Sequence, residues 1–131
     1  MTVLIIDDEE MIRDLALKIL TRAGFDVLTA PTGQSGLELY AEHQSQVDLV
    51  LLDLTMEDMP GLETLKRLRE VSPDLPCLIS SGSVPGIYDL PEELKHNVQF
   101  LQKPYRANQL TEAVNQMLRG LPRQSGQYQQ M

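Results

Sequence analysis

The sequence predicts an α/β fold in which a five-stranded parallel sheet is covered by helices on both faces. Short apolar runs alternate with helical patterns five times along the chain. The runs are nearly continuous in aliphatic residues, which is typical of strands buried on both faces. Parallel neighbours of this kind are joined by right-handed helical crossovers, so the sheet is expected to be open and doubly wound.

The strand at residues 49–52, Leu-Val-Leu-Leu, is the centre of this prediction. It is too short for an independent helix and lacks the polar alternation of a sheet that faces water on one side. Asp53 follows it directly. Because open α/β sheets bind their ligands at the carboxyl ends of the strands, we expect chemistry at Asp53 or close to it.

Four further runs complete the predicted sheet, at residues 3–6, 25–29, 77–79 and 98–102. Helices are expected after the first three strands and after the fifth, because apolar residues recur there every three or four positions. The core face of the first helix is expected to contain Met11, Ile12, Leu15, Ala16, Ile19, Leu20 and Ala23. The third helix is expected to turn Leu62, Leu65, Leu68 and Val71 inward and Glu63, Lys66, Arg67, Arg69 and Glu70 outward.

Length and composition indicate one domain. The chain has 131 residues, of which 42% are hydrophobic, enough to bury a single core. We expect the folded domain to occupy residues 1–119. Residues 120–131 are rich in Gly, Pro, Ser and Gln without periodicity, which predicts a flexible C-terminal tail.

The charge of the chain argues against two classes of partner. With a formal net charge of −8, the protein is not expected to bind nucleic acid directly or to adsorb to anionic membranes. No apolar run approaches the roughly 20 residues that span a bilayer. Cys77 is the only cysteine, so no disulfide is expected and a cytoplasmic location is the simplest interpretation.

Polar side chains follow four of the predicted strands. They are Asp7 and Asp8 after the first strand, Asp53 after the third, Ser80 or Ser81 after the fourth and Lys103 after the fifth. The first and third strands are neighbours in a doubly wound sheet, so the three aspartates should converge. Carboxylates so close together repel one another unless a cation joins them. Mg²⁺ suits an open acidic site of this kind, and Lys103 adds a fixed positive charge.

A carboxylate, Mg²⁺, a hydroxyl and an ammonium group around one point are suited to phosphoryl transfer. Catalysis of that reaction is largely positioning and neutralisation of the charge on the phosphoryl oxygens. Asp53 could attack phosphorus and hold the phosphoryl group as an acyl phosphate. Mg²⁺ and Lys103 would each bind one phosphoryl oxygen, and a serine hydroxyl or a backbone N–H could bind the third.

These residues resemble a known family, the receiver domain of two-component response regulators. The resemblance rests on the acids Asp7-Asp8, on Asp53, on Ser81-Gly82 and on Lys103-Pro104-Tyr105, all in order. It covers residues 2 to about 119. It implies a flavodoxin-like sheet with strand order 2-1-3-4-5, a cis peptide bond before Pro104, and a phosphoryl group received from a histidine kinase or a histidine phosphotransfer protein.

The resemblance also implies a role for each site residue. Asp53 would be the phosphoacceptor, and Lys103 would bind the phosphoryl group. Mg²⁺ would be bound directly by Asp8, through water by Asp7, and by the backbone carbonyl of Thr55. Ser81 would be the switch hydroxyl, and Phe100 the aromatic residue that moves with it. Ser81 is preferred to Ser80 because it directly precedes the small Gly82. The domain would then act on a downstream protein partner and would not be an enzyme beyond its own phosphorylation and dephosphorylation.

Three features depart from the family pattern. Glu57 stands where most receivers have proline, and it adds a carboxylate that could weaken phosphorylation or metal binding. Thr55 occupies a position that tunes the lifetime of the acyl phosphate. Residues 84–97 contain prolines where the family has its fourth helix, and we expect at most a turn or two of helix there, around residues 92–96.

Two alternative functions remain open from the sequence. A degenerate receiver that only binds a partner is one, since Glu57 could impair phosphorylation. A Mg²⁺-dependent phosphatase that uses an aspartyl phosphate is the other and the weaker. Haloacid dehalogenase-like phosphatases need a second aspartate two residues after the nucleophile, and Thr55 holds that position.

Overall fold

The computed structural model describes residues 1–56, 58–82 and 90–119. Its strands are β1 (Thr2–Ile6), β2 (Asp26–Ala30), β3 (Val47–Asp53), β4 (Cys77–Ser81) and β5 (Val98–Gln102). Its helices are α1 (Glu10–Arg22), α2 (Gly33–Glu42), α3 (Gly61–Val71), the short 3₁₀ helix η2 (Glu92–Leu94) and α4 (Ala107–Arg119). The five strands predicted from the sequence are all present.

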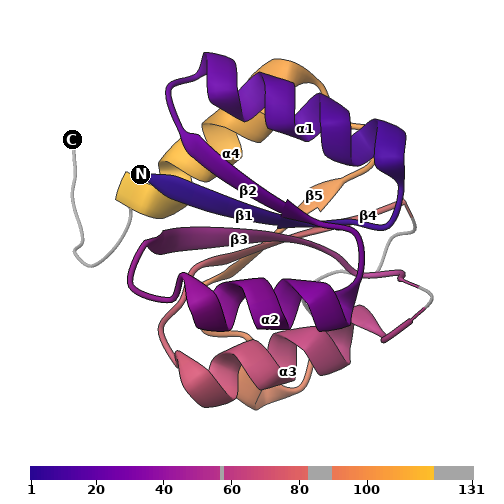
Figure 1. Cartoon of the computed structure of the whole chain (residues 1–131), viewed down its shortest axis with the longest axis vertical. Coiled ribbons are helices and arrows are strands. Elements are labelled where there is room, and N and C mark those ends of the chain that lie inside the picture. The colour runs from indigo at the N-terminus through magenta and orange to yellow at the C-terminus, as the bar shows by residue number, and fades with distance from the viewer. Residues whose placement is uncertain (57, 83–89, 120–131) are drawn as a thin grey trace.

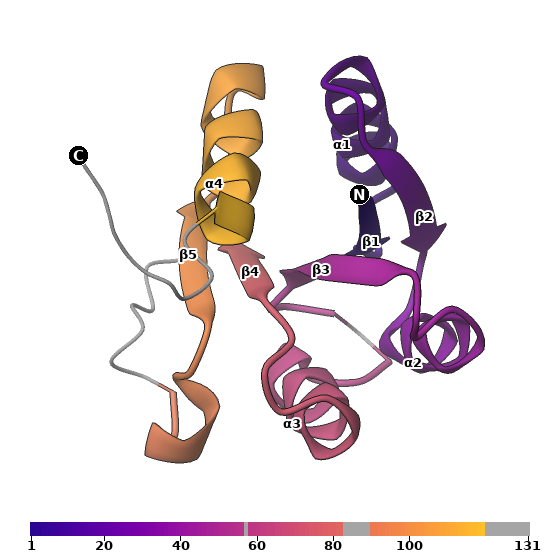
Figure 2. The same cartoon turned by 90° about the vertical axis from the view of Figure 1, so that its left-hand side faces the viewer.

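The strands form one parallel sheet in the order β2-β1-β3-β4-β5, which confirms the expected doubly wound topology. Figure 2 shows this order across the molecule, from β2 at one edge to β5 at the other. In this order β1 lies next to β3. The chain adds β2 on one side of β1 and then β3, β4 and β5 on the other, so the strand order reverses between β1 and β3. The carboxyl ends of β1 and β3 are therefore neighbours, as a site at this edge requires.

Helices cover both faces of the sheet. In Figure 1, α1 and α4 lie above the strands and α2 and α3 lie below them. The layer beneath α1 and α4 contains Val3, Ile5, Ala16, Leu20, Leu49, Leu51, Leu78, Leu110 and Val114 among its buried side chains. The other layer contains Leu4, Ile6, Val50, Leu52, Leu65, Leu68 and Ile79. Alternate residues of β1 and β3 thus point to opposite layers, as the period of a strand requires.

The beginning of α2 is tied to the loop that follows the central strand. Two carboxylate oxygens of Asp58 accept the backbone N–H groups of Gly33 and Gln34, each at 3.1 Å. The next N–H, from Ser35, is bound by the Thr32 hydroxyl at 3.0 Å in a capping box. These bonds satisfy the first N–H groups of the helix, which have no partner within it. The loop after Asp53 is consequently held against α2.

The face that the first helix buries is displaced from the predicted one, because Leu17 packs against the core while Met11 and Leu15 are exposed. Met11 is 86% exposed and Leu15 is 46% exposed, whereas Ala16 and Leu20 are fully buried. Successive residues of a helix are about 100° apart, so the seven predicted core positions extend over about half its circumference. Met11 and Leu15 lie at one margin of that arc, beyond the part that faces the sheet.

The third helix contains the largest error of the sequence prediction. Arg69 was expected in solvent, but it is buried, and its guanidinium donates to the carbonyl oxygens of Leu75, His96 and Asn97. Leu62 and Val71, which were expected inside, are 38% and 55% exposed. The carbonyl groups before β4 and β5 need donors, and the long side chain of Arg69 reaches them from the end of α3. Its burial is offset by these hydrogen bonds.

Between β4 and β5, the described residues contain a single turn of 3₁₀ helix, η2. This agrees with the expected turn or two around residues 92–96. Glu57, the residues from 83 to 89 and the tail at 120–131 lie outside the described part of the chain, so the expectations for them stay predictions. Within the described ranges, no helix has both the length and the apolar character needed to cross a membrane.

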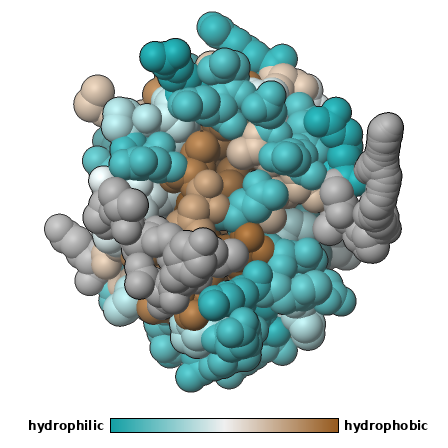
Figure 3. Space-filling model, turned by 180° about the vertical axis from the view of Figure 1, so that it is seen from behind, coloured by the Kyte–Doolittle hydropathy of each residue, from teal (hydrophilic) through white to brown (hydrophobic). Residues whose placement is uncertain are grey.

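Among the described residues, the edge strand β5 pairs with one other strand, β4. Figure 3, which views the molecule from behind, shows an apolar strip across the middle of this side, between polar regions above and below. Phe100 and Leu101 of β5 are each partly buried, one against each layer of the core. Within the described part of the chain, Phe100 and Leu101 thus extend the two core layers to the β5 edge of the sheet.

Candidate functional site

Three aspartates from two neighbouring strands meet at the carboxyl edge of the sheet. Asp53 is the last residue of β3, and Asp7 and Asp8 directly follow β1. One carboxylate oxygen from each lies within 4.8 Å of the others. Asp7 and Asp53 are 3% and 1% exposed, whereas Asp8 is only partly buried. The convergence predicted from the strand ends is confirmed.

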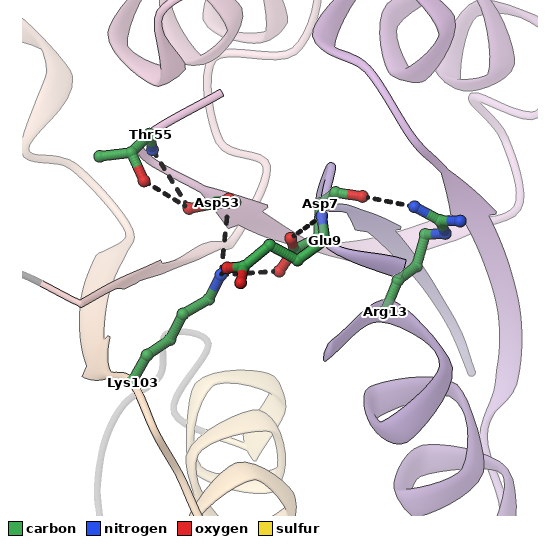
Figure 4. Close-up of polar contacts among 6 residues, drawn as sticks. All are labelled: Asp7, Glu9, Arg13, Asp53, Thr55 and Lys103. Atoms are coloured by element: carbon green, nitrogen blue, oxygen red, sulfur yellow. Dashed lines mark hydrogen bonds and ion pairs between the residues drawn. The ribbon is translucent and has the colours of Figure 1, made fainter. Parts of the chain in front are cut away.

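The two oxygens of Asp53 have different surroundings. Oδ1 accepts the backbone N–H of Thr55 at 3.1 Å and the Thr55 hydroxyl at 3.3 Å. Oδ2 is buried and has no hydrogen-bond partner among the described residues, although the Lys103 ammonium is 3.4 Å away. A buried carboxylate oxygen without a donor is costly unless a cation approaches it. Figure 4 shows this oxygen turned toward Lys103 and the other acids.

The side chain of Lys103 extends from the end of β5 along the carboxyl edge of the sheet and contacts the acidic residues. Its Nζ is 3.0 Å from Asp7 Oδ2, 3.0 Å from Glu9 Oε1 and 3.4 Å from Asp53 Oδ2. The lysine side chain is only 10% exposed. The backbone helps to place it, because the N–H of Lys103 donates to the carbonyl of Ser81 at 2.8 Å. The Lys103-Pro104 peptide bond is cis, as the resemblance implied.

The electrostatics of the site follow from burial and crowding. Burial is the main reason that the pKa of Asp53 rises from 3.8 to about 6, and the nearby charge of Asp7 raises it further. The Thr55 N–H and Lys103 oppose this rise. Burial alone would lower the pKa of Lys103, but hydrogen bonds and charges from Glu9, Asp7 and Asp53 outweigh it and hold that pKa above its usual range. At neutral pH the lysine is charged and Asp53 is mostly ionised.

The acid cluster has the chemistry of a site for a hard divalent cation. Such cations bind carboxylate oxygens, and this cluster offers three, with Asp53 Oδ2 buried and lacking a hydrogen-bond donor among the described residues. One lysine near three aspartates leaves the group with excess negative charge. The cluster of Asp7, Asp8 and Asp53 could therefore hold a metal ion.

The remaining predicted site residues surround this cluster in different ways. Thr55 contacts Asp53 directly, through its N–H and hydroxyl. Ser81 ends β4 and is 3% exposed, while Ser80 pairs with Asp53 in the strand register and accepts the Leu54 N–H through its carbonyl. Phe100 pairs with Ile79 in the register and packs on the core, one strand beyond the aspartates. The choice of Ser81 over Ser80 and the movement of Phe100 stay predictions.

Two residues that sequence reasoning did not assign to the site belong to its surroundings. Glu9 binds Lys103 through its carboxylate and donates its backbone N–H to Asp7 Oδ1 at 2.9 Å. Arg13 donates to the carbonyl oxygen of Asp7 at 2.9 Å. Glu9 could have been suspected as the third acid in the run Asp7-Asp8-Glu9. Arg13 has no comparable signal, because an arginine in the second turn of a helix is usually in solvent.

Comparison with known proteins places these features in a family. Residues 3–115 match the family model described as the response regulator receiver domain. The sensor kinase CckA of Brucella abortus is 34% identical over 119 residues, which are 89% of this chain and 12% of that protein. The chemotaxis protein CheY of Bacillus subtilis is 30% identical over 117 residues, which are 88% of this chain and 96% of CheY. The chain therefore spans nearly all of one relative and a small part of the other.

Solved structures agree with the sequence relatives. A response regulator receiver domain protein from Clostridium thermocellum superposes with a TM-score of 0.80 at 28% identity, over 90% of this chain and 94% of that chain. The receiver domain of the hybrid histidine kinase CckA superposes with a TM-score of 0.77 at 30% identity, over 90% and 99% of the two chains. Fold, acid cluster and relatives agree, and the chain belongs to the family of response regulator receiver domains of two-component signalling.

Proposed function

We propose that this receiver domain accepts a phosphoryl group on Asp53 from a phosphohistidine of a histidine kinase or a histidine phosphotransfer protein. One oxygen of the Asp53 carboxylate attacks phosphorus, the P–N bond to histidine breaks, and an acyl phosphate forms. The observation that carries this proposal is the position of Asp53. It is a 1% exposed carboxylate at the meeting point of Asp7, Asp8 and Lys103.

The other residues neutralise and hold the transferred group. Lys103, already 3.4 Å from Asp53 Oδ2, binds one phosphoryl oxygen. A Mg²⁺ ion held by Asp8, Asp53, the carbonyl of Thr55 and, through water, Asp7 would supply the second positive charge that this chemistry needs. Thr55 keeps Asp53 Oδ1 in place through its N–H. The burial of Asp53 limits the access of water to the acyl phosphate, whose slow hydrolysis resets the domain.

Phosphorylation then changes the surface that a partner binds. The Ser81 hydroxyl moves toward the phosphoryl group, and Phe100 on β5 fills the space that the hydroxyl leaves. The support for this step is the position of the two residues on the adjacent strands β4 and β5, with Phe100 partly buried against the core. The output is docking to a downstream protein in the cytoplasm. An acidic surface with net charge −8 fits a protein partner and not nucleic acid or an anionic membrane.

The direct test is the intact mass of the protein after incubation with acetyl phosphate. The wild type should gain one phosphoryl group with Mg²⁺ and none with a chelator, and Asp53→Asn should gain none under either condition. Asp48→Asn is a matched control, because Asp48 binds the N–H of Thr2 at the other end of the sheet and its loss changes the net charge equally. If the wild type gained no phosphoryl group, the degenerate receiver that only binds a partner would become the better interpretation.

A further inference from the structure

Carboxylates surround the ammonium group of Lys103 in the resting protein. An ammonium has three hydrogens. Three carboxylates surround the Nζ atom, with Asp7 and Glu9 at 3.0 Å and Asp53 at 3.4 Å. If Lys103 is to bind a phosphoryl oxygen, as the proposed function requires, that oxygen has to compete with these carboxylates for the ammonium group.

The three carboxylates differ in how easily they can be released. The side chain of Asp7 is 4% exposed, and its other oxygen is held by the N–H of Glu9. Asp53 is the residue to be phosphorylated and is buried. The Glu9 side chain is 61% exposed, and among the described residues its carboxylate binds only Lys103. Water can replace Lys103 at Glu9 at little cost, whereas the buried carboxylates of Asp7 and Asp53 are much less accessible to water.

We propose that Glu9 is a displaceable partner of Lys103 that competes with the phosphoryl group for the lysine and so slows phosphorylation of Asp53. The backbone of Glu9 is fixed, because its N–H binds Asp7 Oδ1 and its carbonyl accepts the N–H of Arg13 at 2.9 Å. Only the side chain has to move when the phosphoryl group arrives. Glu9 is thus a positioning residue that acts through Lys103, and it does not contact the reacting atoms.

The size of the effect follows from the kind of ion pair. A pair in which one partner is largely exposed is weak, and its loss changes an equilibrium by about twofold to fivefold. Removing the Glu9 contact should therefore raise the rate of phosphorylation by acetyl phosphate by about twofold to fivefold. A simple change in charge near the site could also attract an anionic phosphodonor, so the test has to separate contact from charge.

Two variants make that separation. Glu9→Asp keeps the charge but is one methylene too short to maintain the contact, and aspartate is a favourable residue at this position before α1. Glu10→Gln removes a neighbouring exposed charge and leaves Glu9 and Lys103 in contact. If contact matters, Glu9→Asp and Glu9→Gln are phosphorylated faster than the wild type and Glu10→Gln is not. If only Glu10→Gln and Glu9→Gln are faster, charge alone is responsible and the proposal is overturned.

A second readout does not depend on phosphorylation. The NMR resonances of the Lys103 side chain in the metal-free protein should shift in both Glu9 variants and stay unchanged in Glu10→Gln. Unchanged Lys103 resonances in the Glu9 variants would refute the contact, whatever the rates. This inference rests on the proposed function, and the two fail differently. A wild type that gains no phosphoryl group overturns both, whereas a wild type that reacts at the same rate as Glu9→Asp overturns the competition alone.

Discussion

Replacing Asp53 with asparagine should stabilise the metal-free protein at neutral pH. The reason is the free-energy cost of keeping the buried Asp53 carboxylate ionised beside Asp7, which raises the pKa of Asp53 from 3.8 to about 6. A difference of about two pKa units corresponds to about 3 kcal/mol at 1.4 kcal/mol per unit. Asparagine loses the attraction to Lys103, and solvent at the edge of the sheet screens the charges. We therefore expect a net gain of about 1–2 kcal/mol in the free energy of unfolding.

The sign of this effect gives it a pH dependence. Because the folded-state pKa of Asp53 is higher than that of the unfolded chain, the folded protein binds the proton more tightly. The resulting stability is fully present below 3.8, the ordinary value, and is lost as the pH rises through about 6. The advantage of Asp53→Asn should accordingly be largest above pH 6 and should disappear toward about pH 4.

Urea unfolding in the presence of a chelator, at neutral and at acidic pH, measures both quantities. Asp48→Asn removes the same charge away from the acid cluster and should bring no comparable gain. Adding Mg²⁺ should then favour the wild type, because a cation that binds only the native acids stabilises the folded state. An Asp53→Asn variant that is no more stable than the wild type at neutral pH, or whose gain is equal at both pH values, would refute the reasoning.

Three further predictions concern the scaffold around the site. Asp58→Ala removes the acceptor of two N–H groups at the start of α2 and should lower the free energy of unfolding by about 1 kcal/mol in urea titrations. Arg69→Met leaves buried carbonyl oxygens without a donor and should cost about 2–4 kcal/mol in the same titration; a loss below that of Asp58→Ala would contradict its structural role. The Cys77 thiol, whose pKa burial raises to about 12, should resist iodoacetamide until urea unfolds the protein, and rapid labelling of the native state would show otherwise.

The sheet and the acid cluster could be predicted because they depend on short-range patterns. A buried parallel strand is a continuous apolar run, and the residue after it lies at a known edge. The runs that end at Asp7 and Asp53 therefore indicated both the strands and the meeting of the carboxylates. The structure extends the central strand to Val47–Asp53 and moves the second to Asp26–Ala30, but these shifts leave the edge unchanged.

Contacts between distant parts of the chain could not be read in this way. Glu9 and Lys103 are 94 positions apart, and only the folded sheet shows that their side chains meet. Asp58 binds two N–H groups of α2 that lie 25 and 24 positions earlier in the chain, and no local sequence pattern indicates this contact. Arg69 sits on what the helical period makes a polar face, yet it is long enough to reach buried carbonyl groups beyond the end of α3. At Arg69 the side-chain length and the tertiary position override the helical period, and the contacts of Glu9 and Asp58 depend on the tertiary fold alone.

The central claim is that Asp53 itself receives the phosphoryl group, and chemical trapping tests it most directly. Borohydride reduces an acyl phosphate to an alcohol, so a phosphorylated aspartate becomes homoserine and can be located by mass spectrometry of peptides. After incubation with acetyl phosphate and Mg²⁺, homoserine should appear at Asp53 and should be absent when a chelator replaces Mg²⁺. Homoserine at Asp7 or Asp8, or a phosphorylated protein that yields no homoserine after borohydride treatment, would contradict the account.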